Sequence, residues 1–186
     1  MTSTAPATLV VPCYDEAHRL DAGAFVALLD ADPACSLLFV NDGSTDGTAA
    51  LLAALAARRP GRIRVLDLGR NRGKAEAVRR GLLDALAAPA EIVGYVDADL
   101  ATPTAEVERL LELMRGRDTH VLLAARVALL GRRIERGPLR HYLGRIFASM
   151  ASLVLRLRVY DTQCGAKLFR AGPALSDALS APFLSV

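Results

Sequence analysis

Two aspartates separated by one residue follow directly after an apolar segment. Asp97, Ala98 and Asp99 come after residues 91–96, Glu-Ile-Val-Gly-Tyr-Val. An apolar run of this length between turn residues is typical of a buried strand. Two carboxylates so close together repel each other unless they share a cation. Oxygen ligands suit a hard divalent ion that also holds phosphate groups. The pattern therefore indicates a metal-diphosphate site, with a helix N-cap and a solvated acidic turn as the alternative.

Two further apolar segments also end in polar residues. Residues 8–12 lead into Cys-Tyr-Asp-Glu at 13–16, and residues 36–40 lead into Asn-Asp-Gly-Ser-Thr-Asp-Gly at 41–47. A helical pattern follows each of them. Ligands of open α/β sheets bind outside the carboxyl ends of the strands. We therefore expect the three strand ends to form one site.

The chain alternates between strand and helix patterns along its length. This alternation predicts an α/β fold, a mainly parallel sheet with helices on both faces. The length of 186 residues favours one domain, 1–186. We expect Ser44 or Thr45 to cap the second helix, and Thr102 with Pro103 to start the helix after the aspartates. The predicted strands are 8–12, 36–40, 62–66, 92–96 and 120–124, and the predicted helices are 20–29, 48–57, 74–86 and 104–115.

Four motifs in this order carry a family resemblance: residues 11–16, 40–48, 71–74 and 95–99. Together they resemble the family 2 inverting glycosyltransferases with a GT-A fold. The string Asp-Thr-Gln-Cys-Gly-Ala-Lys-Leu-Phe at 161–169 is similar to the branch of dolichyl-phosphate β-glucosyltransferases and bacterial polyprenyl-phosphate glycosyltransferases. The resemblance implies transfer of a sugar, with UDP-glucose as the leading donor, to a polyprenyl or dolichyl phosphate with inversion. GDP-mannose, the donor of a neighbouring branch, is the alternative.

The resemblance also implies roles for individual residues. Asp99 would bind Mg²⁺ or Mn²⁺ directly, and Asp97 would contact the ribose or a metal-bound water, so both belong to the expected metal set. Asp42 would accept a hydrogen bond from the uracil ring, although Asn-Asp-Gly is also a turn signal by itself. Lys74, at a helix start, would contact the diphosphate or uridine, or would be an ordinary solvated lysine. The residues assigned to the nucleotide are Pro12, Tyr14, Asp15, Glu16, Asp42, Lys74, Asp97, Ala98 and Asp99.

The sugar and the acceptor phosphate are assigned to three other residues. Arg126 follows a predicted strand and can clamp a phosphate. Gln163 and Lys167 belong to the branch string. Relatives carry an aromatic-Asp-x-Glu motif further on, which does not occur before Val186. The catalytic base is therefore unknown, and we expect it beyond the chain end. A C-terminally truncated domain that binds nucleotide without turnover is the second alternative.

The basic residues are unevenly distributed. The net charge is +3, yet the segment 126–145 holds Arg126, Arg132, Arg133, Arg136, Arg140, His141 and Arg145. Such a cluster suits phosphate or an anionic membrane surface. The segment has Tyr142 as its one Phe, Tyr or Trp residue and has no nucleic-acid motif, so nucleic acid is not an expected partner. An apolar stripe over 139–157 predicts either a helix packed on the core or an interfacial helix.

Other features bear on location. No stretch reaches the roughly 18 apolar residues of a membrane span, and residues 1–7 lack the basic region of a signal peptide. The three cysteines have no metal-binding spacing and read as reduced thiols. We therefore expect a cytoplasmic protein that contacts the cytoplasmic membrane face peripherally. Lys74 and Lys167 are the two lysines among 23 basic residues, and both fall within the motifs.

Overall fold

The computed structural model describes residues 5–124 and 164–182. The chain divides into two compact units, residues 1–122 with 165–186, and residues 123–164. Nearly all the described residues belong to the first unit. Arg126, Gln163, the basic segment 126–145 and the predicted helix over 139–157 lie outside the described residues.

A single sheet organises the described part of the chain. Its six strands follow the order β3-β2-β1-β4-β6-β5. β1 pairs in parallel with both β2 and β4, β2 pairs in parallel with β3, and β6 runs antiparallel to β4. The predicted mainly parallel sheet is therefore confirmed. The strands are β1 (Ala7–Cys13), β2 (Cys35–Asn41), β3 (Ile63–Asp67), β4 (Ile92–Val96), β5 (Val121–Leu123) and β6 (Ala166–Arg170).

Strand order and direction place several chain segments at one edge of the sheet. The four parallel strands β1, β2, β3 and β4 all end at this edge, and the antiparallel β6 begins there. The connections from β1 and from β3 leave in opposite directions across the sheet, because β1 lies between β2 and β4. A reversal of this kind opens a crevice at the carboxyl ends of the strands, where α/β sheets bind ligands.

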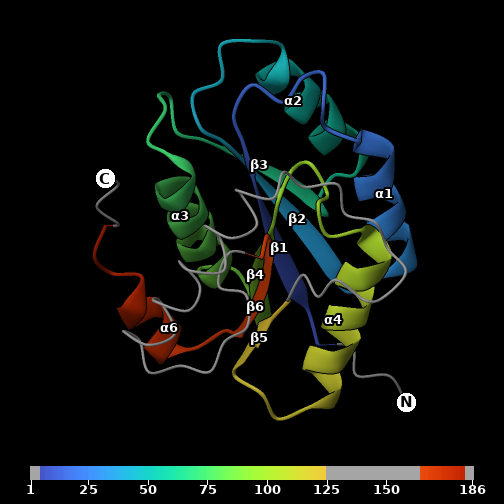
Figure 1. Ribbon diagram of the computed structural model, residues 1–186, viewed down its shortest axis with the longest axis vertical. Coiled ribbons are helices and arrows are strands. Elements are labelled where there is room, and N and C mark those ends of the chain that lie inside the picture. Colours follow the sequence, from blue (N-terminus) through green and yellow to red (C-terminus); the bar gives the residue numbers. More distant parts are fainter. Residues whose placement is uncertain (1–4, 125–163, 183–186) are drawn as a thin grey trace, which may run out of the picture. The chain divides into compact units, whose positions relative to one another are not determined.

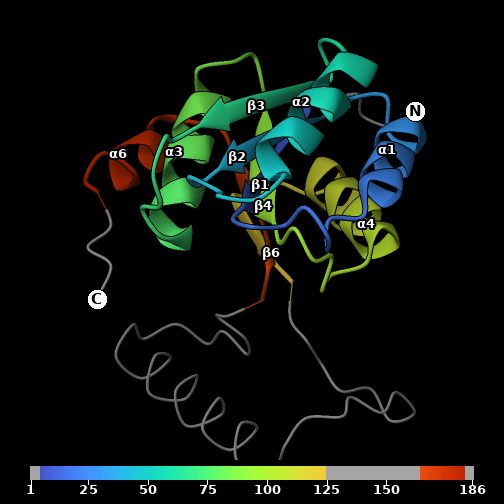
Figure 2. The same cartoon turned by 90° about the horizontal axis from the view of Figure 1, so that it is seen from above.

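Helices cover both faces of the sheet. α3 and α6 lie on one face, and α1 and α4 lie on the other (Figures 1 and 2). α2 packs against β2 and β3. None of the described helices combines the length and the apolar character that crossing a membrane requires. The helices are α1 (Ala22–Ala31), α2 (Thr48–Arg58), α3 (Lys74–Leu86), α4 (Thr104–Gly116) and α6 (Pro173–Ala178).

Helices α2 and α4 begin at the predicted residues, 48 and 104, but their N-caps differ from the predicted ones. The N-cap of α2 is Gly47, which makes no side-chain capping bond, so the prediction of Ser44 or Thr45 was wrong. The Ser44 hydroxyl instead accepts the backbone N–H of Asp15, 3.1 Å away in the loop after β1. The N-cap of α4 is Pro103, one residue later than a cap at Thr102 would be. The Ser44 hydroxyl therefore joins the loops after β1 and β2 and does not cap α2.

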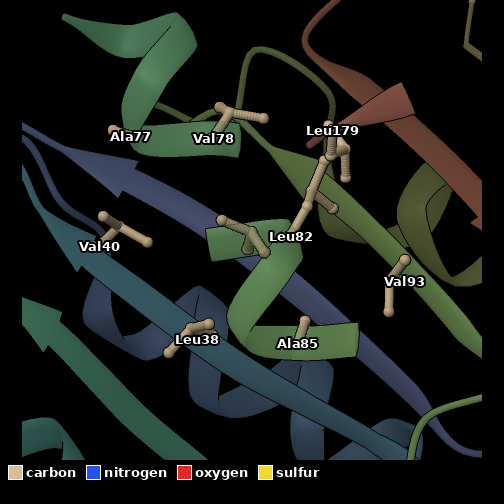
Figure 3. Close-up of a cluster of buried hydrophobic side chains, with 9 residues drawn as sticks. Leu38, Val40, Ala77, Val78, Leu82, Ala85, Val93 and Leu179 are labelled. Atoms are coloured by element: carbon tan, nitrogen blue, oxygen red, sulfur yellow. The ribbon is translucent and has the colours of Figure 1, made fainter. Parts of the chain in front are cut away.

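An apolar cluster fixes α3 against the sheet (Figure 3). Gly81 lies in the middle of this helix, and a Cβ there would come within 2.3 Å of Val10 Cγ1, so the helix backbone approaches β1 closely. This packing holds the first turn of α3 at the carboxyl edge of the sheet. The cluster consists of Val10, Leu38, Val40, Ala77, Val78, Leu82, Ala85, Val93 and Leu179.

A buried ion pair lies within α3, and its arginine also bonds to Leu179, the residue that follows α6. Arg79 Nε lies 2.7 Å from Glu76 Oε2, and each side chain is 10% exposed. Arg79 also donates to the carbonyl of Leu179 at 2.7 Å, and Arg80 donates to Glu76 at 2.8 Å. The hydrogen bond from Arg79, supported by Arg80, lowers the pKa of Glu76 to about 2.

Glu76→Gln is expected to destabilise the protein near neutral pH. It is also expected to reduce the loss of stability that the protein undergoes in acid. Because the folded-state pKa of Glu76 lies below the unfolded value of about 4.3, its stabilisation is present above that value. The stabilisation is lost as the pH falls toward about 2. Breaking a buried pair leaves Arg79 without its charged partner, which costs roughly 3 kcal/mol.

Urea unfolding at pH 7 and pH 3 measures both effects. Glu106→Gln is the matched control, because Glu106 also pairs with an arginine three residues later, but both side chains are more than half exposed. We expect the difference between parent and Glu76→Gln to shrink at pH 3, and Glu106→Gln to resemble the parent at both values. An equal difference in stability between the parent and Glu76→Gln at the two pH values would contradict the assignment of this acid dependence to Glu76.

Candidate nucleotide and metal site

The loops after β1 and β2 are tied together by hydrogen bonds. The backbone N–H of Asp15 donates to Ser44 Oγ at 3.1 Å, and that of Glu16 donates to Thr48 Oγ1 at 2.8 Å. In return, the carboxylate of Asp15 accepts the N–H of Thr45 at 2.8 Å. Asp15 itself has a positive φ of 52°, a conformation that aspartate tolerates better than most residues. The two loops therefore form one structural unit.

Asp42 connects the loop after β2 to the turn that precedes α3. Its residue is only 3% exposed. One carboxylate oxygen accepts the N–H of Arg72 at 2.8 Å, and the other accepts the N–H of Gly73 at 3.0 Å. Asp42 thus holds the turn immediately before Lys74. Each oxygen keeps a further lone pair, so the expected uracil contact of Asp42 stays a prediction.

Lys74 opens α3 and lies against the first aspartate of the Asp-x-Asp pair. Gly73, with a φ of 88°, is the N-cap of this helix. Lys74 Nζ lies 2.6 Å from Asp97 Oδ1, with side-chain exposures of 62% and 17%. The motif around residues 71–74 and the motif around residues 95–99 therefore meet in space.

The two aspartates have different surroundings. Asp97 is half-buried, and its N–H donates at 3.0 Å to the carbonyl of Gly165, the residue just before β6. Asp99 is exposed, and its Oδ1 accepts the N–H of Ala101 at 3.0 Å. The intervening Ala98 is buried. Leu100, next along the chain, has a positive φ of 49°. The tight turn keeps both carboxylates at the carboxyl edge of the sheet.

Gly165 is a site residue that sequence reasoning missed. A Cβ at this position would lie 2.0 Å from Asp97 Oδ2 and 2.4 Å from its Cγ. The carboxylate of Asp97 therefore occupies the space that any other residue at position 165 would fill. The available signal was the position of this glycine within the string 161–169.

Gly165→Ala is expected to displace the Asp97 carboxylate and to lower UDP affinity in the presence of Mn²⁺ by about tenfold, equivalent to about 1.4 kcal/mol. Isothermal titration with UDP measures this. Gly116→Ala serves as the control, because a Cβ at Gly116 meets nothing within 4 Å. If UDP binds both variants equally well, the contact between Gly165 and Asp97 has no role in binding.

The remaining predicted residues are placed as follows. Lys167 lies opposite Tyr95 in the pairing of β6 with β4, and its Nζ is 5.4 Å from the centre of the Tyr95 ring. Tyr14, just after β1, is 43% exposed. Pro12 is the penultimate residue of β1. Glu16 lies in the loop after β1, and its Oε2 is buried without a hydrogen-bond partner.

The donor set fits a hard divalent cation. Asp97 and Asp99 offer carboxylate oxygens, and the ammonium of Lys74 already stands where a positive charge compensates Asp97. Among the residues that the structure describes, no three or more His, Cys, Asp and Glu side chains gather to hold a metal. The carboxylates would therefore need oxygens from a ligand or from water to complete the coordination of Mg²⁺, which commonly binds through one or two carboxylates plus phosphates.

Two of the three cysteines are poorly suited to bind a metal or to act as a nucleophile. Cys13, Cys35 and Cys164 are buried and form no disulfide. Burial raises the pKa of the Cys13 and Cys35 thiols to about 12. At neutral pH both therefore stay protonated, whereas a thiolate is the form that attacks or binds metal.

Solved structures of GT-A glycosyltransferases share the fold of this chain. A mannosyltransferase from Pyrobaculum calidifontis in complex with GDP-Man and Mn²⁺ matches 98% of this chain and 48% of its own, with a TM-score of 0.60 and 21% identity. Glucosyl-3-phosphoglycerate synthase from Mycobacterium tuberculosis, in complex with Mn²⁺, UDP and glucosyl-3-phosphoglycerate, matches 90% of this chain and 57% of its own, with a TM-score of 0.63 and 18% identity. The predicted fold class is confirmed.

The chain belongs to glycosyl transferase family 2, whose pattern it matches over residues 8–174. It is 34% identical to a dolichyl-phosphate beta-glucosyltransferase, ALG5C, of Trichomonas vaginalis over 175 residues, 87% of this chain and 51% of the relative. It is 33% identical to the undecaprenyl-phosphate 4-deoxy-4-formamido-L-arabinose transferase of Sodalis glossinidius over 109 residues, 57% of this chain and 32% of the relative. The chain spans about half the length of the dolichyl-phosphate relatives that it matches.

Proposed function

We propose that this chain is the donor-binding part of an enzyme that transfers glucose from UDP-glucose to a polyprenyl or dolichyl phosphate with inversion. The observation that carries the proposal is the meeting of the loops after β1, β2 and β3 with the Asp97 turn after β4. The similarity to dolichyl-phosphate beta-glucosyltransferases over 87% of the chain supports glucose and a lipid-phosphate acceptor. The GDP-mannose alternative has only a fold-level likeness behind it.

The nucleotide sugar would lie along the carboxyl edge of the sheet. Tyr14, Asp15 and Glu16 lie on the loop unit that suits the base and ribose, and the buried turn at Asp42 adjoins it. The diphosphate suits the first turn of α3, where free backbone N–H groups and Lys74 favour anions. Mg²⁺ or Mn²⁺ held by Asp99 and Asp97 would neutralise the charge of the departing UDP.

The acceptor phosphate is itself the nucleophile. One of its oxygens attacks the anomeric carbon of glucose from the face opposite UDP, and the electron pair of the breaking bond leaves with the UDP phosphate. A phosphate monoester is already largely anionic near pH 7, so the need for a general base is small. Lys167, with Arg126 and Gln163, is proposed to bind this phosphate. The basic segment 126–145 is proposed to contact an anionic membrane surface.

A thermal-shift panel with UDP, UDP-glucose, GDP and GDP-mannose, each with and without Mn²⁺, tests the donor. Ligand at 100 times its Kd stabilises the folded state by about 2.7 kcal/mol. We expect the largest shift with UDP-glucose and Mn²⁺. A larger shift with GDP-mannose would identify GDP-mannose, and not UDP-glucose, as the donor. Transfer of labelled glucose to polyprenyl phosphate in vesicles tests the acceptor. If the chain binds the nucleotide but transfers no glucose, it is a nucleotide-binding module without turnover.

A further inference from the structure

The contact between Lys74 and Asp97 places a cation against a carboxylate in the expected metal set. The two side chains form an ion pair with an Nζ to Oδ1 distance of 2.6 Å, and Oδ1 accepts no hydrogen bond from any residue that the structure describes. Asp97 is the enclosed member of the pair, with 17% side-chain exposure, and Gly165 packs on its other oxygen. The carboxylate is therefore fixed, and its charge is compensated by the lysine.

The backbone of Lys74 is fixed as well, whereas its side chain is accessible. Asp42 holds the two preceding N–H groups, and α3 packs on the sheet through its apolar cluster. The Lys74 side chain is 62% exposed. A long flexible side chain on a rigid helix start can reach a second anion nearby without moving the helix. The first turn of α3 is also where a diphosphate is favoured.

With Asp97 as a second metal ligand beside Asp99, as in the proposed function, a divalent cation and the lysine ammonium compete for the Asp97 carboxylate. Both neutralise Asp97, and two cations in contact with one carboxylate would repel each other at close range. The metal alone must displace the ammonium and leave it without its partner. A metal that arrives with a diphosphate brings Lys74 a new anionic partner, so the displacement costs less.

We propose that Lys74 is a surrogate cation, which occupies the metal's place at Asp97 in the nucleotide-free protein and moves to the diphosphate when metal and nucleotide bind. This inference rests on the proposed function of the site. It makes the binding of metal and of nucleotide mutually supportive, as linkage requires. It also predicts that removing the lysine ammonium strengthens the binding of Mn²⁺ and weakens the binding of UDP. An ordinary surface ion pair does not predict such opposite effects.

Lys74→Met is expected to bind Mn²⁺ about fivefold more tightly than the parent in the absence of nucleotide. Titration of free Mn²⁺ by electron paramagnetic resonance measures this affinity without any turnover. With saturating Mn²⁺, the same variant is expected to bind UDP about tenfold more weakly, because the diphosphate loses a cationic partner. Isothermal titration gives the second value.

Two variants separate this account from a general change in charge. Arg80→Met removes one positive charge from the same helix, but Arg80 pairs with Glu76 and not with Asp97, so Mn²⁺ affinity should stay near that of the parent. Lys74→Arg keeps a cation and should also retain the low Mn²⁺ affinity of the parent. Mn²⁺ affinity that is equal or lower in Lys74→Met, including no measurable binding in either protein, overturns the surrogate cation. Failure of the parent to bind UDP with Mn²⁺ would instead reject the proposed function.

Discussion

Asp99→Ala is expected to lower the affinity for UDP, measured with Mn²⁺ present, by roughly 30-fold or more, since losing an interaction with a charged group costs about 2 kcal/mol. Asp99 is exposed, and its one described bond, to the N–H of Ala101, lies at the surface. The substitution should therefore leave the stability of the fold nearly unchanged. In EDTA, parent and variant should bind UDP equally weakly.

Thr104→Ala provides the control for Asp99→Ala. Thr104 is the first residue of α4, close in sequence to the aspartates but not among the carboxylates of the site. Isothermal titration of UDP should give this variant the affinity of the parent. Equal UDP affinity for Asp99→Ala and the parent, both with Mn²⁺, would remove Asp99 from the metal set.

Gly43→Ala is expected to destabilise the protein by roughly 3–5 kcal/mol. Gly43 has a φ of +69°, which costs an L-residue about 1–2 kcal/mol. A Cβ at this position would also lie 2.3 Å from the backbone carbon of Arg70 and 2.4 Å from the backbone nitrogen of Asn71. Relief would require the turn before α3 to move away from Asp42. Both the fold and the position of Lys74 therefore depend on this glycine.

Gly69→Ala separates the two causes. Gly69 has the same φ of +69°, but a Cβ there meets nothing within 4 Å. It should therefore cost only the conformational penalty of about 1–2 kcal/mol. Urea unfolding of both variants gives the comparison. If Gly43→Ala were no more destabilising than Gly69→Ala, the close packing of the loop after β2 on residues 70–71 would be refuted.

The elements that carry the site were predictable because local pattern and tertiary role coincide. β1 and β2 are covered on both faces, so they appear in the sequence as short continuous apolar runs. α3 was predicted with its observed bounds, 74–86. Its apolar residues recur at helical spacing, and Gly73 marks its start. The turn after β4 follows directly from the end of its apolar run.

Other features depend on contacts between distant segments. β6 has only five residues, Ala-Lys-Leu-Phe-Arg, and the sequence did not predict it as a strand or its antiparallel pairing with β4. The role of Gly165 requires knowing that Asp97 fills the space beside it. Similarly, Asp42 was singled out as a candidate, but its bonds to Arg72 and Gly73 join residues about thirty positions apart. No local pattern encodes such a pairing.

The central claim is that the carboxyl edge of the sheet binds a nucleotide diphosphate through a divalent cation at the Asp-x-Asp pair. The most direct test is a crystal structure of this chain with UDP and Mn²⁺, in which anomalous scattering locates the metal. We expect the Mn²⁺ peak in contact with the Asp99 carboxylate and the diphosphate of UDP, and Lys74 moved from Asp97 toward that diphosphate. UDP bound elsewhere, or a Mn²⁺ peak in contact with neither Asp97 nor Asp99, would contradict the account.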